Sequence, residues 1–187
     1  REFREWLPAT SWAAKAQLSG SFVSSNIEDY YLTPWDLGVN HLLKFDHDFV
    51  GRAALEAMGD KPHRRKVTLV WNKEDLARIQ GSLFQPGIPF KYLELPVAAY
   101  GFPQADTVLN AGGKRIGMSG FCGYSANEAE MLSIAVVDEA YCTPGTPVTL
   151  TWGEPDGGTR KAQVERHRQM DVHVSAFAHT DSQSARK

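Results

Sequence analysis

The sequence predicts an α+β chain in which a mixed helix-and-loop segment precedes a small, mainly β module. From about residue 66 onward, short runs of β-branched and apolar residues alternate with Gly-rich turns, a pattern typical of small antiparallel barrels and sandwiches. The segment before that point reads as helix and loop, and it is too short to form a domain alone. A chain of 187 residues, 42% of them hydrophobic, can bury a core without a disulfide or a metal ion.

The segment before residue 60 is expected to contain two helical stretches around an ordered loop. Residues 3–18 are interpreted as helix and loop with an interruption at Pro8. Residues 20–34 form the predicted loop. A short helix is expected from about residue 51 to residue 58, with Asp48 as its candidate cap. This segment is therefore interpreted as a mixed α/β remnant.

The β module is expected to contain two hairpins, two further strands and one short helix. The strands are predicted at residues 66–71, 107–109, 115–118, 132–137, 148–152 and 160–164, and the helix at residues 73–79. A turn-rich, basic connector precedes the first strand and places the boundary near residues 60–66. We therefore expect a first unit over residues 1–62, a β-barrel domain over residues 63–178 and a flexible tail over residues 179–187.

Charge and cysteine content argue against several classes of protein. Twenty basic residues against 22 acidic ones give a net charge of −2, which disfavours nucleic acid or a membrane surface as partner. No apolar run approaches the roughly 18 residues of a membrane helix. Cys122 and Cys142 are interpreted as reduced thiols. No signal peptide is visible, so we expect a cytoplasmic protein. The chain does not begin with Met, so we expect that it is either processed or a piece of something longer.

Simple catalytic and metal-binding motifs are mostly missing. The sequence has no phosphate-binding loop and no nucleophile elbow. His167, His173 and His179 lack a further ligand at metal-site spacing, so we expect them to face solvent, with no metal bound. Residues 46–48 (DHD) are interpreted as capping and turn chemistry rather than as an acid–base pair.

The segment from Glu28 to Trp35 carries the strongest candidates for ligand binding. Tyr30 and Tyr31 are adjacent in a loop, and together with Trp35 they cannot all point into one core. Aromatic faces stack on planar heterocycles, and tyrosine hydroxyls orient them. The alternative is a loop packed on the protein body by one tyrosine and the tryptophan, and the residues alone leave both interpretations open.

Four stretches of the chain resemble the glycine-cleavage T-protein (aminomethyltransferase) family. They are residues 33–38 (TPWDLG), 45–55 (FDHDFVGRAAL), 117–120 (GMSG) and 140–146 (AYCTPGT). The family has a Thr-Pro loop, an Asp-Phe-Ile-Gly step, a Thr-Ser-Gly turn and a Pro-Gly-Thr stretch at the corresponding places, in the same order. Family members are longer at the N-terminus. The resemblance thus implies a C-terminal part: the end of an α/β folate-binding region, then a small C-terminal antiparallel β-barrel.

Departures from the family pattern indicate which branch the chain resembles. Counting back from Thr33 puts the glycine of an Arg-rich family run at Gly20, and its Arg and Glu positions then fall on Ala16 and Leu18. These departures disfavour aminomethyl transfer. Residues 30–38 (YYLTPWDLG) and the later LVWN stretch are more similar to the tetrahydrofolate-dependent aryl O-demethylases.

This resemblance implies a methyltransferase that moves a methyl group from vanillate- or syringate-type methyl ethers to N5 of tetrahydrofolate. The implied partners are a small aromatic substrate and the N-terminal folate-binding half of the same protein. Tyr30, Tyr31 and Trp35 would line the binding pocket, Glu28 would contact the pterin edge, and no catalytic residue is assigned. The family's main folate-binding carboxylate lies outside this chain, so we expect the chain alone neither to turn over substrate nor to bind folate tightly.

Two alternatives to this methyltransferase remain open from the sequence. The first is a fragment of a glycine-cleavage aminomethyltransferase, and the second is a non-catalytic β-barrel module that closes the pocket of a separate catalytic half. An exposed apolar face carrying Trp6, Trp12 and Phe22 would favour the module.

Overall fold

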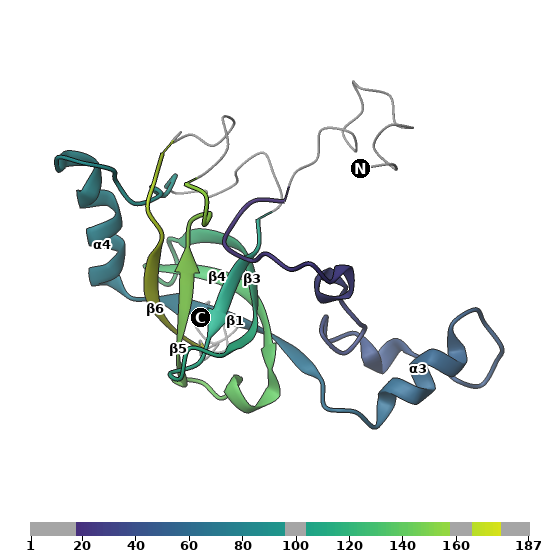
Figure 1. Cartoon of the computed structure of the whole chain (residues 1–187). Helices are drawn as coiled ribbons and strands as arrows, with labels where there is room; N and C mark the ends of the chain where they lie inside the picture. Colours follow the sequence, from purple (N-terminus) through teal and green to yellow (C-terminus); the bar gives the residue numbers. More distant parts are fainter. Residues whose placement is uncertain (1–17, 96–103, 158–165, 177–187) are drawn as a thin grey trace, which may run out of the picture.

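A closed β-barrel of six antiparallel strands forms the body of the molecule (Figure 1). The computed structural model describes residues 18–95, 104–157 and 166–176. The strands follow one another around the barrel in the order β1-β4-β3-β2-β5-β6, so the barrel expected from the sequence is confirmed. The strands are β1 (Arg64–Trp71), β2 (Asp106–Leu109), β3 (Arg115–Ser125), β4 (Glu130–Asp138), β5 (Pro147–Trp152) and β6 (Met170–Ala176). The helices are η1 (Ile27–Tyr30), η2 (Asn40–Leu42), α3 (Arg52–Gly59), α4 (Lys73–Gly81), η3 (Ser82–Phe84) and η4 (Glu139–Tyr141).

Alternating side chains fill the interior of the barrel. In β5 the buried positions are Val148, Leu150 and Trp152, and β6 buries every second residue in the same way. Successive side chains of a strand point to opposite faces, so a period of two directs one apolar set inward. Trp71 of β1 completes the centre of the core, because its ring meets that of Trp152 edge to face with centroids 5.4 Å apart.

The first predicted hairpin joins β2 and β3 and is confirmed. Asn110 sets its turn: the side-chain oxygen accepts hydrogen bonds from the backbone N–H groups of Gly112 and Lys114, each 3.0 Å long. This is the local bonding by which asparagine favours turns. Gly113 follows with a φ of 74°, a conformation that costs glycine little.

The second predicted hairpin is wrong. Both edges of β5 are occupied, by β2 and by β6, and residues 160–164, its expected partner, lie outside the described residues. The glycine signal does mark a turn, since Gly157 has a φ of 80° and its N–H donates to the carbonyl of Glu154. That turn opens a longer excursion, which closes where the N–H of His167 donates to the Gly157 carbonyl at 3.2 Å.

The α-helices predicted at residues 51–58 and 73–79 are present, but one predicted cap is wrong. The helical stretch expected within residues 3–18 lies outside the described residues up to residue 17. α3 begins after Gly51, which has a φ of 94° and makes no side-chain cap, so Asp48 does not cap this helix. The chain instead turns into α3 through a left-handed glycine. α4 begins in the usual way at Asn72, whose side-chain oxygen accepts from the N–H groups of Glu74 and Asp75.

The residues before β1 form an arm, defined here as residues 18–63, which runs from the barrel end out to α3 (Figure 1). Its elements η1, η2 and α3 contain no buried residue. A strand-containing α/β remnant is not shown here, because the one strand-like contact of residues 18–63 is a bridge between Ser19 and Gln104. Across the described ranges, every helix is too short or too polar to cross a membrane.

Candidate functional site

Gly20 fixes the arm to one end of the barrel. It passes so close to the backbone of Ala105 that a Cβ atom there would lie 2.1 Å from the Ala105 carbonyl oxygen. Its φ of 99° also lies in a region that side chains rarely adopt. Its N–H donates a 2.9 Å hydrogen bond to Oε1 of Glu154. Only glycine fits this crossing, at the position where the resemblance placed the family's glycine.

A buried ionic cluster lies at this crossing. Oε1 of Glu154 accepts a 2.7 Å bond from Nζ of Lys91, and Oε2 lies 2.8 Å from Nε2 of His167. Burial opposes the charge of Glu154, but the bonds from His167 and Lys91 outweigh it and hold the pKa of this carboxyl well below its usual range. The cluster joins the arm, the segment after α4 and the two segments that flank the excursion between β5 and β6.

Ser21 and Asp106 strengthen the same crossing. The Ser21 hydroxyl donates to the carbonyl of Thr151 and accepts from the N–H of Thr107, so it ties the arm to β5 and β2. Asp106 accepts from the N–H of Ser21 at 3.1 Å and from the side chain of Gln104. Burial nevertheless raises the pKa of Asp106 to about 6, because these bonds only partly offset the loss of water.

Arg64, at the start of β1, forms a second anchor for the arm. Its guanidinium makes a fork on Asp36, with Nε 3.2 Å from Oδ1 and Nη2 2.9 Å from Oδ2, and Nη2 also donates to the carbonyl of Tyr31. Asp36 accepts a further bond from the N–H of Thr33. Burial opposes the charge of Asp36, but the bonds from Arg64 and Thr33 outweigh it and lower its pKa. The loop from Tyr31 to Asp36 is therefore held against β1.

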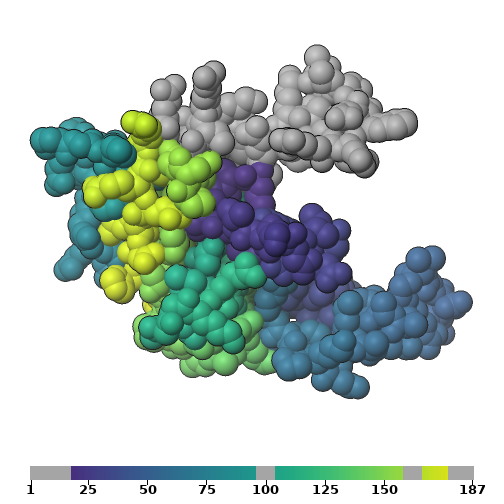
Figure 2. All heavy atoms as spheres, viewed as in Figure 1, coloured from purple at the N-terminus to yellow at the C-terminus, as the bar shows by residue number. Residues whose placement is uncertain are grey.

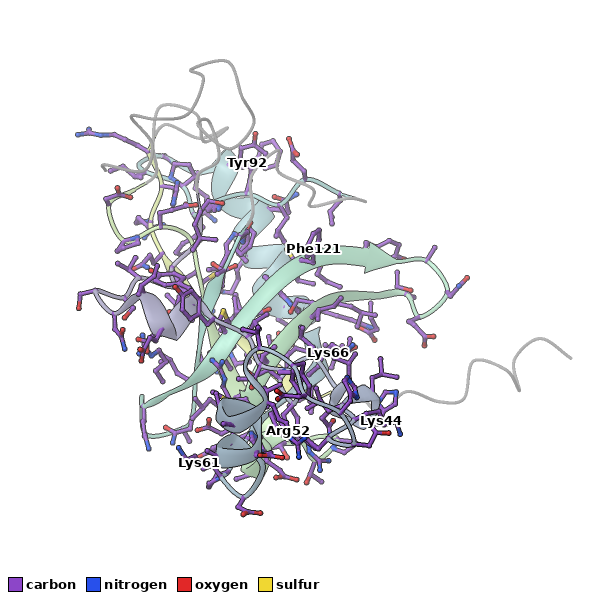
Figure 3. The ribbon with its side chains drawn as sticks, turned by 90° about the vertical axis from the view of Figure 1, so that its right-hand side faces the viewer. Lys44, Arg52, Lys61, Lys66, Tyr92 and Phe121 are labelled. Carbon is purple, nitrogen blue, oxygen red and sulfur yellow. The ribbon has the colours of Figure 1, made fainter. Side chains whose placement is uncertain are left out.

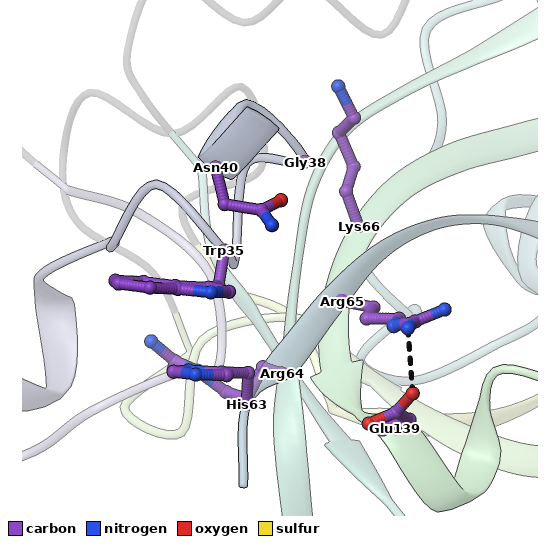
Figure 4. A pocket seen from close by; sticks show the side chains of 8 residues that line it. All are labelled: Trp35, Gly38, Asn40, His63, Arg64, Arg65, Lys66 and Glu139. Carbon is purple, nitrogen blue, oxygen red and sulfur yellow. Dashed lines mark ion pairs between the residues drawn. The ribbon is translucent and has the colours of Figure 1, made fainter. Parts of the chain in front are cut away.

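A pocket of about 400 Å³ opens between this loop and β1 (Figure 4). Its aromatic side is the ring of Trp35, which stacks on His63 with centroids 4.5 Å apart and planes 3° apart. Its other side carries the charged side chains of β1. The lining residues are Trp35, Gly38, Asn40, His63, Arg64, Arg65, Lys66 and Glu139.

Positive charge dominates this pocket. Glu139 is the one carboxylate in its lining and forms a 2.8 Å ion pair with Arg65, in which both side chains are more than half exposed. Lys66 forms no ion pair with any described residue, and Figure 4 shows its ammonium pointing away from the Arg65–Glu139 pair. The arrangement can accept an anionic group beside a flat ring.

One of the four predicted binding residues lines the pocket, and it is Trp35. Tyr31 is 60% exposed. The Tyr30 hydroxyl accepts a 2.8 Å bond from the N–H of Ser24, which uses it within the arm itself. Glu28 lies exposed in the first turn of η1. Folate binding by these four residues stays a prediction.

The expectation of solvent-facing histidines is wrong for His167, whose side chain is fully buried. Its Nε2 accepts a 3.1 Å hydrogen bond from the N–H of Glu154 and lies 2.8 Å from Oε2 of the same residue, and no spacing in the sequence indicates these contacts. His173 does face solvent, with 76% of its side chain exposed, and His179 lies outside the described residues. Within the described part of the chain, no group of three or more His, Cys, Asp or Glu side chains could hold a metal ion. Both cysteines are free, and burial raises the pKa of Cys122 to about 12.

Large apolar side chains of the arm lie in solvent. Val50 is fully exposed, and Leu42 is 66% exposed. The space-filling view shows this outer part of the arm projecting beside the barrel (Figure 2). Phe22, by contrast, is buried, so it contributes to no exposed apolar face, and Trp6 and Trp12 lie outside the described residues.

The barrel has an exposed aromatic residue of its own. Phe121 sits at a bulge in β3, where the register with β4 shifts between Gly120 and Cys122. It is 82% exposed with a φ of 26°, and Figure 3 shows it on the long β3 strand. Ile134, which pairs with Gly120, is half exposed.

Sequence reasoning missed the cluster around Glu154 and the charged wall of the pocket. The cluster joins residues that are far apart in the chain, so no sequence motif with a fixed spacing predicts it. The wall leaves a weak signal, because residues 64–66 (RRK) are a basic run at the beginning of a predicted strand. The sequence places Arg64 and Arg65 in the connector and only Lys66 in the strand.

Comparisons with known proteins relate the chain to longer enzymes. It is 46% identical over 171 residues to a syringate O-demethylase from Sphingobium sp. (strain NBRC 103272 / SYK-6), and the match covers 91% of this chain and 37% of that protein. It is 30% identical over 175 residues to a sesamin methylene transferase from Sinomonas sp. (strain No.22), covering 87% and 37%. A crystal structure of the glycine cleavage system aminomethyltransferase T from Bartonella henselae matches with a TM-score of 0.45 at 18% identity, covering 78% of this chain and 31% of that one. No family model matches the chain.

These relatives confirm the resemblance found in the sequence to the glycine-cleavage T-protein family and, within it, to the O-demethylases, with the syringate O-demethylase as a relative at 46% identity. The chain spans 37% of the length of each of these two curated relatives.

Proposed function

We propose that the chain is the C-terminal part of a tetrahydrofolate-dependent methyltransferase that demethylates aromatic methyl ethers of the vanillate or syringate type. The observation that carries the proposal is the 46% identity, over 91% of the chain, to a protein named for syringate demethylation. The second relative is named for methylene transfer, so both names describe the transfer of a one-carbon group.

The chemistry asks this chain for positioning rather than for a covalent intermediate. When bound, tetrahydrofolate would supply N5 as the methyl acceptor, and the proton lost from N5 would balance the phenolate that the ether leaves behind. Trp35 offers a flat face to an aromatic part of a ligand, and Arg65 and Lys66 attract anionic groups. These residues fit a ligand that combines a ring with carboxylates.

We propose that the partner of this chain is the N-terminal folate-binding half of the same protein. The support is that the chain spans 37% of its curated relatives and that the helices of its arm contain no buried residue. α3 has eight residues and none is buried, whereas so short a helix is marginal in water without packing. In this proposal residues 1–62 end the folate-binding region, residues 63–178 form the barrel domain and residues 179–187 form the tail.

A methyl-transfer assay on the complete protein tests the proposal. Syringate or vanillate with tetrahydrofolate is expected to give the demethylated phenol and 5-methyl-tetrahydrofolate in equal amounts, and glycine-cleavage substrates are expected to give no transfer. Demethylation that proceeds equally well without folate would refute it. Calorimetry on this chain alone is expected to show no tight folate binding, and submicromolar binding would overturn that part.

A non-catalytic barrel that closes the pocket of a separate catalytic half is the second candidate. The observation in its favour is that the only carboxylate lining the described pocket, Glu139, is ion-paired, so no acid–base pair is assembled there. The N-terminal half produced without this chain separates the two candidates. Full activity of that half would favour an accessory module, and loss of activity would favour an essential part of the enzyme.

A further inference from the structure

We propose that the pocket between Trp35 and Lys66 binds a carboxylate that is attached to a flat aromatic ring. Two molecules of the proposed reaction carry this chemistry: the aminobenzoyl-glutamate end of folate, and an aromatic acid such as syringate. The inference rests on the proposed function only for the choice of these two probes.

Lys66 supplies the charge that the pocket leaves unbalanced. It lies exposed on β1, opposite Val136 of β4, and forms no ion pair with any described residue. Arg64, beside it in the lining, is already engaged by the buried carboxylate of Asp36. The ammonium of Lys66 is therefore the cation of this lining that is open to an incoming anion.

Arg65 is a second cation that a ligand can recruit. Its ion pair with Glu139 is 2.8 Å long, and the side chains are 64% and 57% exposed. A pair so exposed is weak because water screens it, so a ligand carboxylate competes with Glu139 for the guanidinium. Glu139 thus weakens anion binding in this pocket, and its removal strengthens it.

Trp35 supplies the surface for the ring. His63 covers one face of its indole at a 3° angle, which fixes the orientation of the ring. Asn40 lies on the opposite side of the indole (Figure 4). The fork between Arg64 and Asp36 holds the loop that carries Trp35, so the pocket is formed before a ligand arrives and little ordering entropy opposes binding.

The test is isothermal titration calorimetry on the complete protein with 4-aminobenzoyl-glutamate and with syringate. Lys66→Gln is expected to weaken carboxylate binding up to about fivefold, and Glu139→Gln to strengthen it about twofold. Lys61→Gln is the matched control, because Lys61 is an exposed lysine outside the lining (Figure 3) and the same charge is removed. Neutral amides of both probes are expected to bind equally well to the wild type and to Lys66→Gln.

Lys66→Gln and Glu139→Gln are expected to change the affinity in opposite directions. A folding defect cannot explain this result, because it does not tighten binding. An effect confined to 4-aminobenzoyl-glutamate identifies the folate end as the ligand, and one confined to syringate identifies the substrate acid. Equal effects of Lys66→Gln and Lys61→Gln, weaker binding by Glu139→Gln, or no binding of either acid overturns the proposal. Absence of folate-dependent methyl transfer ends the proposed function but leaves Lys66-dependent carboxylate binding unaffected.

Discussion

At the residue scale, Glu154 makes hydrogen bonds with distant parts of the chain. Gly20 and Lys91, which donate to its carboxylate, are 134 and 63 residues away from it, and His167, whose Nε2 accepts from its backbone N–H, is 13 residues away. A sequence pattern reports neighbours along a strand or a helix, so neither this cluster nor the burial of His167 is visible before the barrel closes. The aromatic residues Tyr30, Tyr31 and Trp35 are visible as candidates, but which of them lines the pocket depends on how Arg64 holds the loop.

Removing the charge of Glu154 is expected to destabilise the chain. Glu154→Gln leaves the buried ammonium of Lys91 without its carboxylate, and the free energy of unfolding should fall by about 3 kcal/mol. Urea denaturation at neutral pH measures this. Glu128→Gln, a substitution at an exposed position, should change it by less than about 0.5 kcal/mol. Equal small effects of both variants would contradict the role of the cluster.

Asp106 is expected to make the barrel less stable as the pH rises. Its pKa is about 6 in the fold against 3.8 ordinarily, so the unfolded chain loses this proton first. The free energy of unfolding therefore falls between about pH 4 and pH 7, by up to about 3 kcal/mol. The low pKa of Glu154 has a different effect. The stability that its charged carboxylate contributes is present above its ordinary pKa of 4.5 and is lost only in acid. Asp106→Asn should flatten the decline in urea denaturation, and pH profiles parallel to that of the wild type would refute the assignment.

Phe121 is expected to cost stability through its backbone. A φ of 26° is strained for any side chain, and the residue is 82% exposed, so little packing is lost on truncation. Phe121→Gly should raise the free energy of unfolding by about 1 kcal/mol. Tyr124→Gly on the same strand, where φ is not positive, should lower it. Thermal denaturation of both variants tests this prediction. Destabilisation by Phe121→Gly would show that packing of the ring stabilises the fold.

At the element scale, the sequence predicted the turns and helix starts that depend only on residues close together in the chain. The β2–β3 turn follows from Asn110, and the start of α4 follows the usual capping pattern at Asn72. The partner of β5 was not predictable from its turn residues, because Gly157 opens an excursion and β6 returns only at Met170. α3 was located, but its start depends on the backbone of Gly51 and not on a capping side chain.

The anchor between the arm and β1 is expected to depend on the forked geometry of arginine. Arg64→Lys keeps the positive charge but loses the two-pronged bond to Asp36 and the bond to the Tyr31 carbonyl. Hydrogen exchange of the loop from Tyr31 to Asp36 should accelerate roughly tenfold, which corresponds to about 1.4 kcal/mol. Exchange of the β4 core should stay unchanged. Unchanged exchange in the loop would show that other contacts hold it.

At the scale of the whole molecule, the barrel is complete and the arm is not. The six strands close on one another and bury two tryptophans, whereas η1, η2 and α3 bury nothing. The family resemblance was visible in the sequence because it rests on four short stretches in a fixed order, each of which is local in the chain. The packing of the arm was not predictable, since the surface that covers it belongs in our proposal to the N-terminal half.

The most direct measurement of the central claim follows a ¹³C-labelled methyl group of syringate in the complete protein with tetrahydrofolate. The account predicts that the label appears on N5 of the folate, with one demethylated phenol formed for each label transferred. Label released elsewhere, or turnover that does not require folate, would contradict it.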